Sequence, residues 1–138
     1  MKELKIEAKL ENLDPLLEFV NTELEEIHCP KKTQNQISIA VEEIFVNIVH
    51  YAYQPVTGFA LVRAGAGNSE IRIEFEDTGK PYNPLDKANP DITSDVEDRI
   101  VGGLGVFLVK KIMDKVEYRF EGNRNLLSIV KTIPNLDD

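Results

Sequence analysis

The chain has 138 residues, of which 42% are hydrophobic and 29% are charged, and its formal net charge is −8. This length and composition predict a single globular domain over residues 1–138 with a core of its own, and they exclude an intrinsically disordered chain. The net negative charge leaves no basic surface for nucleic acid, and no apolar run is long enough to span a bilayer, so we expect neither nucleic-acid nor membrane partners. A single cysteine excludes an internal disulfide, and we expect a cytoplasmic protein.

The N-terminal third is predicted to form a strand followed by a helix. Apolar and charged residues alternate over residues 4–10, which is typical of a half-buried strand. Asp14 and Pro15 then provide a capping acid and a first-turn proline, so a helix is expected to start there. Pro30 ends this helix.

A second helix is expected from Thr33 to about residue 54, and it carries the first candidate functional pair. Gln36 would complete a capping box with Thr33. Glu43 and Asn47 lie four residues apart, so they share one helical face beside the apolar stripe. Asn47 is a candidate Mg²⁺ ligand and Glu43 a candidate proton acceptor, although two ordinary polar residues on an exposed face would give the same pattern.

Two strands, residues 59–63 and 70–77, are predicted to be joined by a turn over residues 65–68. The second strand ends at Asp77, with Gly79 two residues later. A carboxylate at a strand end beside a glycine turn can accept a hydrogen bond from the amino group of a nucleotide base. A turn-forming aspartate is the simpler interpretation of this pair taken alone.

A glycine cluster follows an irregular segment and leads into an apolar helix. Residues 80–101 lack periodicity and contain several prolines, which indicates a functional lid or disorder. Gly102, Gly103 and Gly105 place bare backbone N–H groups at a helix start, where a phosphate can approach. The same glycines could serve only close packing, and no Walker A sequence occurs.

The chain closes with a predicted hairpin around residues 122–123. The order of elements is therefore strand, two helices, two strands, lid, helix and two strands. This order predicts an α+β two-layer sandwich with a mixed, mainly antiparallel sheet, helices on one face and water on the other. The acidic turn, the acid–amide helix and the glycine cluster together indicate a nucleotide site.

These three parts resemble the Bergerat ATP-binding fold shared by sensor histidine kinases, type II topoisomerases and heat-shock chaperones. Residues 40–53 (AVEEIFVNIVHYAY) are similar to its N box, residues 77–84 (DTGKPYNP) to its G1 box and residues 102–109 (GGLGVFLV) to its G2 box. The closest resemblance is to the stand-alone anti-sigma-factor serine kinases of bacteria, and it covers essentially the whole chain.

The resemblance implies a role for each matching position, with ATP and Mg²⁺ as cofactors. Glu43 would be the catalytic base and Asn47 the Mg²⁺ ligand. Asp77 would bind the adenine amino group, in a pocket shaped by Gly79. The nucleotide would also be bound by the G2 box, through Gly102, Gly103, Leu104 and Gly105, and its three glycines would line the triphosphate.

The resemblance also implies a serine kinase, usually a homodimer, that phosphorylates a small antagonist protein and sequesters a sigma factor. The sequence departs from the family in the N box: Ile48 replaces a common alanine, and Tyr51 replaces a common histidine. Two alternatives therefore stay open. The chain could be a non-catalytic ATP-binding interaction module, or a stand-alone histidine-kinase-type ATP domain that acts in trans.

Overall fold

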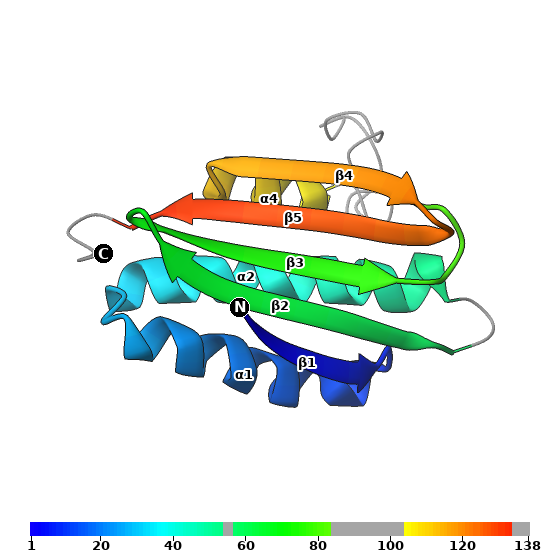
Figure 1. The fold of residues 1–138 in the computed structure, drawn as a ribbon, viewed down its shortest axis with the longest axis horizontal. Coiled ribbons are helices and arrows are strands. Elements are labelled where there is room, and N and C mark those ends of the chain that lie inside the picture. The colour runs from blue at the N-terminus through cyan, green and yellow to red at the C-terminus, as the bar shows by residue number, and fades with distance from the viewer. Residues whose placement is uncertain (54–56, 84–103, 134–138) are drawn as a thin grey trace.

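The computed structural model describes residues 1–53, 57–83 and 104–133, and its centre is a five-stranded sheet (Figure 1). Every pair of neighbouring strands in this described part is antiparallel, so the expected mixed or mainly antiparallel sheet is antiparallel there. The strands lie in the order β1-β2-β3-β5-β4, with bounds Lys2–Glu7 (β1), Phe59–Gly67 (β2), Glu70–Asp77 (β3), Lys115–Glu121 (β4) and Arg124–Thr132 (β5).

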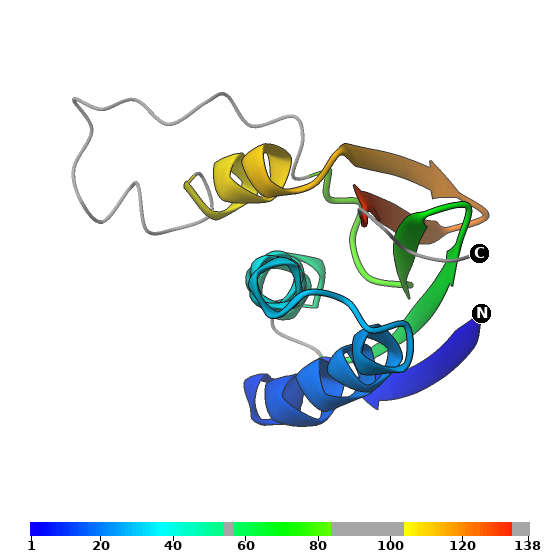
Figure 2. The same ribbon diagram turned by 90° about the vertical axis from the view of Figure 1, so that its left-hand side faces the viewer.

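The helices cover one face of the sheet, as Figure 2 shows, and α2 lies between α1 and α4. The predicted two-layer α+β architecture is thereby confirmed. None of the described helices has the length and apolar character needed to cross a membrane. The helical bounds are Leu10–Asn12 (η1), Leu13–Glu26 (α1), Lys31–Asn47 (α2), Ile48–Ala52 (η2, one wide π-helical turn) and Leu104–Ile112 (α4).

The core lies between the sheet and the helices and follows the expected periodicities. On β3, Ile71, Ile73 and Phe75 alternate with polar residues and are buried, as predicted for this strand. The helices contribute large side chains at three- and four-residue spacing. Burying each such side chain stabilises the fold by roughly 1.5–3 kcal/mol. The largest fully buried helical residues are Leu16, Val20, Leu24, Ile37, Val41 and Phe45.

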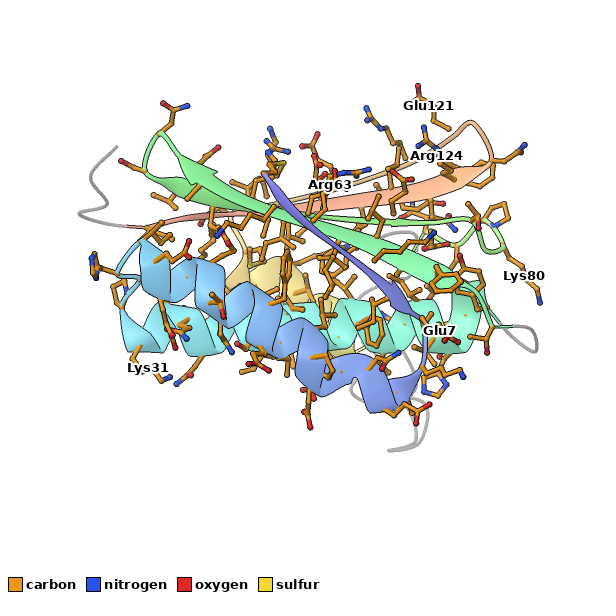
Figure 3. All side chains as sticks on the ribbon, turned by 60° about the horizontal axis from the view of Figure 1, so that its bottom comes forward. Glu7, Lys31, Arg63, Lys80, Glu121 and Arg124 are labelled. Carbon is orange, nitrogen blue, oxygen red and sulfur yellow. The ribbon has the colours of Figure 1, made fainter. Side chains whose placement is uncertain are left out.

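The opposite face of the sheet carries charged side chains, as predicted for a face open to water (Figure 3). Arg63 on β2 forms ion pairs with Glu76 at 2.9 Å and Glu3 at 3.5 Å, and Arg124 on β5 pairs with Glu76 at 3.2 Å. Partial burial alone would raise the pKa of Glu76. The hydrogen bonds from Arg63 and Arg124 outweigh that effect and hold the pKa below its usual range.

The β2–β3 turn lies later in the chain than the sequence predicted. β2 continues through Gly67, which pairs with Glu70, so the turn consists of Asn68 and Ser69. Both turn residues have positive φ, 55° and 62°, as a two-residue type I′ hairpin requires. The predicted turn over residues 65–68 is therefore wrong. The glycine-rich run before it belongs to the strand.

The start of α2 also differs from the prediction. The helix begins at Lys31 after Pro30, and no side chain caps it. Thr33 already lies inside the first turn, so the capping box with Gln36 is wrong. The closing hairpin is confirmed, with Gly122 and Asn123 at positive φ between β4 and β5. Of the predicted lid, only residues 80–83 belong to the described part of the chain.

Candidate functional site

Asp77 is the buried carboxylate at the end of β3, with only 4% of its surface exposed. Its Oδ1 atom accepts hydrogen bonds from the Gly79 backbone N–H at 2.9 Å and from Asn125 Nδ2 at 2.8 Å. Burial raises the pKa of Asp77, while these two hydrogen bonds favour the ionised form and reduce the shift. The carboxylate is thus desolvated, held in one orientation and ready to accept a further donor.

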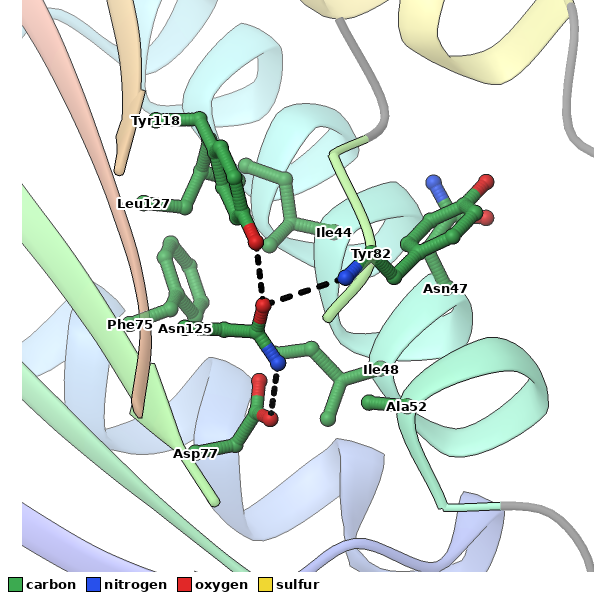
Figure 4. A pocket seen from close by; sticks show the side chains of 10 residues that line it. All are labelled: Ile44, Asn47, Ile48, Ala52, Phe75, Asp77, Tyr82, Tyr118, Asn125 and Leu127. Carbon is green, nitrogen blue, oxygen red and sulfur yellow. Dashed lines mark hydrogen bonds between the residues drawn. The ribbon is translucent and has the colours of Figure 1, made fainter. Parts of the chain in front are cut away.

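Asn125 lies directly opposite Asp77 on the neighbouring strand β5 and uses its whole carboxamide. Nδ2 donates to Asp77 and to the Lys80 carbonyl at 2.8 Å. Oδ1 accepts from the Tyr82 backbone N–H at 3.1 Å and from the Tyr118 hydroxyl (Figure 4). Asn125 therefore ties the segment after β3 to the sheet.

Asn125 was not among the residues predicted from the sequence, although a signal was available. Its side chain shares the inward face of β5 with Leu127 and Ile129, two and four residues later, and all three are buried. A polar residue on a buried strand face needs hydrogen-bonding partners, which marks the position for attention. Tyr118 and Tyr82 gave no comparable signal, since aromatic residues are ordinary in a core.

Asn47, at the end of α2, faces the same cavity as Asp77, and 7% of its surface is exposed. Glu43 lies one turn earlier and is partly buried, outside the cavity lining. Burial, followed by repulsion from Glu42, raises the pKa of Glu43. Glu42 is exposed, as expected for a residue on another face. The structure thus brings Asn47 and Asp77 together and keeps Glu43 on the adjacent turn.

The cavity between α2 and the sheet has a volume of about 30 Å³, which holds one or two water molecules. Its apolar walls include Ile44, Phe75 and Leu127. Tyr82 closes one side and stacks on Tyr51, with ring centroids 4.8 Å apart and an interplanar angle of 15°. A ligand with a planar ring system therefore needs this cavity to widen before it can enter.

The turn after β3 is fastened to the end of the helical segment. The Lys80 N–H donates to the Ala52 carbonyl at 2.9 Å, and the Thr78 N–H donates to the Tyr53 hydroxyl at 2.8 Å. A Cβ atom on Gly79 would lie 2.4 Å from the Ala52 carbonyl oxygen, so glycine is required by the close approach of two backbones.

The remaining predicted residues belong to the glycine cluster. Leu104 and Gly105 begin α4, which contacts α2. Gly102 and Gly103 lie outside the described residues. Over residues 1–53, 57–83 and 104–133, no three His, Cys, Asp or Glu side chains gather as a metal site. Asn47 can offer one amide oxygen, which suits a Mg²⁺ ion that takes its other ligands from water and phosphate.

Comparison with known families decides the identity of this fold. The family described as the histidine kinase-like ATPase domain matches residues 6–131. The chain belongs to this family. The predicted superfamily is thus confirmed.

Among curated proteins, this ATPase domain is similar to enzymes named serine-protein kinase RsbW. The proteins from Bacillus cereus (strain AH820) and Bacillus thuringiensis (strain Al Hakam) are each 28% identical over 95 residues, which is 66% of this chain. The chain spans 59% of the length of these relatives.

Solved structures agree on the fold. The RsbU and RsbW domains of Rv1364c from Mycobacterium tuberculosis align with a TM-score of 0.64 and 12% identity, over 96% of this chain and 33% of that one. The catalytic domain of histidine kinase ThkA aligns with a TM-score of 0.53 and 15% identity, over 96% of this chain and 99% of that one. At these identities the likeness establishes the architecture alone.

Proposed function

We propose that this ATPase domain is an ATP-dependent protein serine kinase that also acts as an anti-sigma factor. It would phosphorylate a serine on a small antagonist protein and sequester a sigma factor, working as a homodimer and as a single domain over residues 1–138. The observation that carries the proposal is the buried Asp77 carboxylate facing Asn47 across one cavity. The similarity to serine-protein kinases supports the reaction type.

The nucleotide would bind with its base toward the sheet and its triphosphate toward the helices. Asp77 is the acceptor for the amino group of adenine, and Gly79 permits the close turn beside it. Asn47 would hold Mg²⁺, which neutralises charge on the phosphates when bound. Backbone N–H groups of the G2 box would contact the triphosphate, at Gly102, Gly103, Leu104 and Gly105.

Glu43 would accept the proton of the attacking serine hydroxyl. The serine oxygen forms a bond to the γ-phosphorus, the bond to ADP breaks, and the hydroxyl proton moves to the Glu43 carboxylate. A proton acceptor works best when its pKa lies closer to the operating pH. Partial burial, which raises the pKa of Glu43, fits this role. Segment 80–101 would serve as the lid that excludes water.

The test uses transfer of labelled phosphate from ATP to proteins captured from the native cell. We compare the wild type with Glu43→Ala and with the matched control Glu42→Ala, since Glu42 is the exposed neighbour on another helix face. Glu43→Ala is expected to slow transfer by about 10²–10⁴-fold and to spare ATP binding. Glu42→Ala removes only the smaller cause of the raised pKa of Glu43, so its rate is expected to stay within a few-fold of the wild type.

The product separates the proposal from its two alternatives. Acid-stable phosphoserine on a captured protein supports the kinase. Acid-labile phosphohistidine would identify a histidine-kinase-type domain acting in trans. ATP binding with no transfer to any captured protein would identify a non-catalytic interaction module, and equal rates for wild type and Glu43→Ala would eliminate Glu43 as the base.

A further inference from the structure

The orientation of the Asn125 carboxamide is fixed by its four partners. Nδ2 faces two acceptors, Asp77 Oδ1 and the Lys80 carbonyl, each at 2.8 Å. Oδ1 faces two donors, the Tyr82 N–H and the Tyr118 hydroxyl. A flipped amide would set its oxygen against a carboxylate and its N–H groups against donors. Only one arrangement satisfies all four contacts.

Three of the residues in this network stand on adjacent strands. Tyr118 belongs to β4, Asn125 to β5 and Asp77 to β3, and these strands are neighbours in the sheet. The hydroxyl of Tyr118 donates to Asn125, which in turn donates to Asp77 (Figure 4). The three residues of this chain lie outside segment 80–83, so neither of its two hydrogen bonds is made by the Tyr82 wall.

The contacts leave one side of the Asp77 carboxylate for a ligand. Both hydrogen bonds that the described residues donate to Asp77 end on Oδ1. A carboxylate offers acceptor sites on both of its oxygens, and Asp77 itself lines the cavity. Because Asn125 holds Oδ1 from the sheet side, the remaining acceptor sites on Oδ2 are those available to a bound base.

We propose that Asn125, supported by Tyr118, is a positioning residue for base recognition, which holds Asp77 so that Oδ2 accepts a hydrogen bond from the exocyclic amino group of a purine. The inference rests on the proposed role of Asp77 and extends it to two residues that need not touch the nucleotide. It assigns the discrimination of purines by their amino group to the Tyr118–Asn125–Asp77 chain.

The experiment measures dissociation constants by calorimetry, with Mg²⁺ present, for ATP and for purine riboside triphosphate, which lacks the amino group. The proteins are the wild type, Asn125→Leu, Tyr118→Phe and the control Ser128→Ala on the opposite face of β5. The wild type is expected to prefer ATP about 10- to 100-fold, the range for a hydrogen bond to a charged group. Asn125→Leu is expected to reduce this preference to within about threefold of unity, with Tyr118→Phe between the two.

The ratio of the two constants distinguishes positioning from a general loss of structure, because a loosened pocket weakens both ligands alike. A wild-type ratio retained in both Asn125→Leu and Tyr118→Phe would overturn the inference and leave the role of Asp77 intact. A ratio near unity in the wild type would overturn that role and the inference with it. If Asn125→Leu fails to fold, Tyr118→Phe, which removes one oxygen atom, decides the test alone.

Discussion

Replacing Asp77 with asparagine is expected to stabilise the fold and weaken nucleotide binding. In Asp77→Asn the side-chain oxygen can keep both existing hydrogen bonds, from Gly79 and from Asn125. The new amide nitrogen then takes the place of Oδ2. The amino group of the base then meets a donor in place of an acceptor. The free energy of nucleotide binding should weaken by about 1.5–3 kcal/mol, which is about 10- to 100-fold in affinity.

The effect on stability follows from the raised pKa of Asp77. Because burial holds the folded-state pKa above the ordinary value of 3.8, the stability contributed by the protonated carboxyl is fully present below that value. It is lost as the pH rises through the raised pKa. The amide carries no charge, so Asp77→Asn should avoid this loss and be more stable than the wild type near pH 7.

The assay is thermal unfolding of both proteins across the pH range 3–8, together with calorimetric ATP titration at pH 7. For a chain of 138 residues, about 1 kcal/mol corresponds to a change of roughly 3–4 °C in Tm. The difference in Tm between variant and wild type should grow as the pH rises. A constant or falling difference would refute the argument from desolvation, and unchanged ATP affinity would refute the role in base recognition.

Three further predictions concern the turn, the cavity wall and the open face. Gly79→Ala places a Cβ 2.4 Å from a backbone oxygen, so the free energy of unfolding in denaturant should fall by about 1–3 kcal/mol; an unchanged midpoint would contradict this. Tyr82→Ala removes the ring that closes the cavity, so stopped-flow measurements with a fluorescent ATP analogue should show faster association, and a wild-type rate would show that this ring does not limit entry. Glu76→Gln should lower the free energy of unfolding by about 0.2–1 kcal/mol at pH 7. The ion pairs of a carboxylate with a lowered pKa stabilise the fold above its ordinary pKa, and this stabilisation is lost as the pH falls through the lowered pKa, so the substitution should cost nothing below it. A cost that does not change with pH would exclude the ion pairs with Arg63 and Arg124.

The helices and strands could be predicted well because the spacing of their hydrophobic residues follows which positions are buried. Ile71, Ile73 and Phe75 mark β3 by alternation, and the helical stripes mark α1 and α2. Element ends were harder to predict. Asn68 and Ser69 form the β-turn through positive φ angles, a property of the backbone that the preceding glycines obscured.

The candidate site could be predicted only in part, because it depends on contacts between distant segments. Asp77 and Asn47 were identified from local patterns, and the fold brings them to one cavity. Asn125 lies 48 residues after Asp77, and its importance comes from strand pairing that composition does not reveal. Tyr82 lines the cavity and stacks on Tyr51, a contact that no spacing rule in the sequence predicts.

Hydrogen bonds between residues 78–80 and the end of the helical segment hold one side of the site in place, and Tyr82 forms the side that can move. Two hydrogen bonds and the backbone contact at Gly79 join this turn to Ala52 and Tyr53. A displacement of this turn would also displace η2, which directly follows Asn47 at the end of α2. A ligand should therefore enter by displacing Tyr82, and it contacts an Asp77 carboxylate that already has the orientation needed for binding.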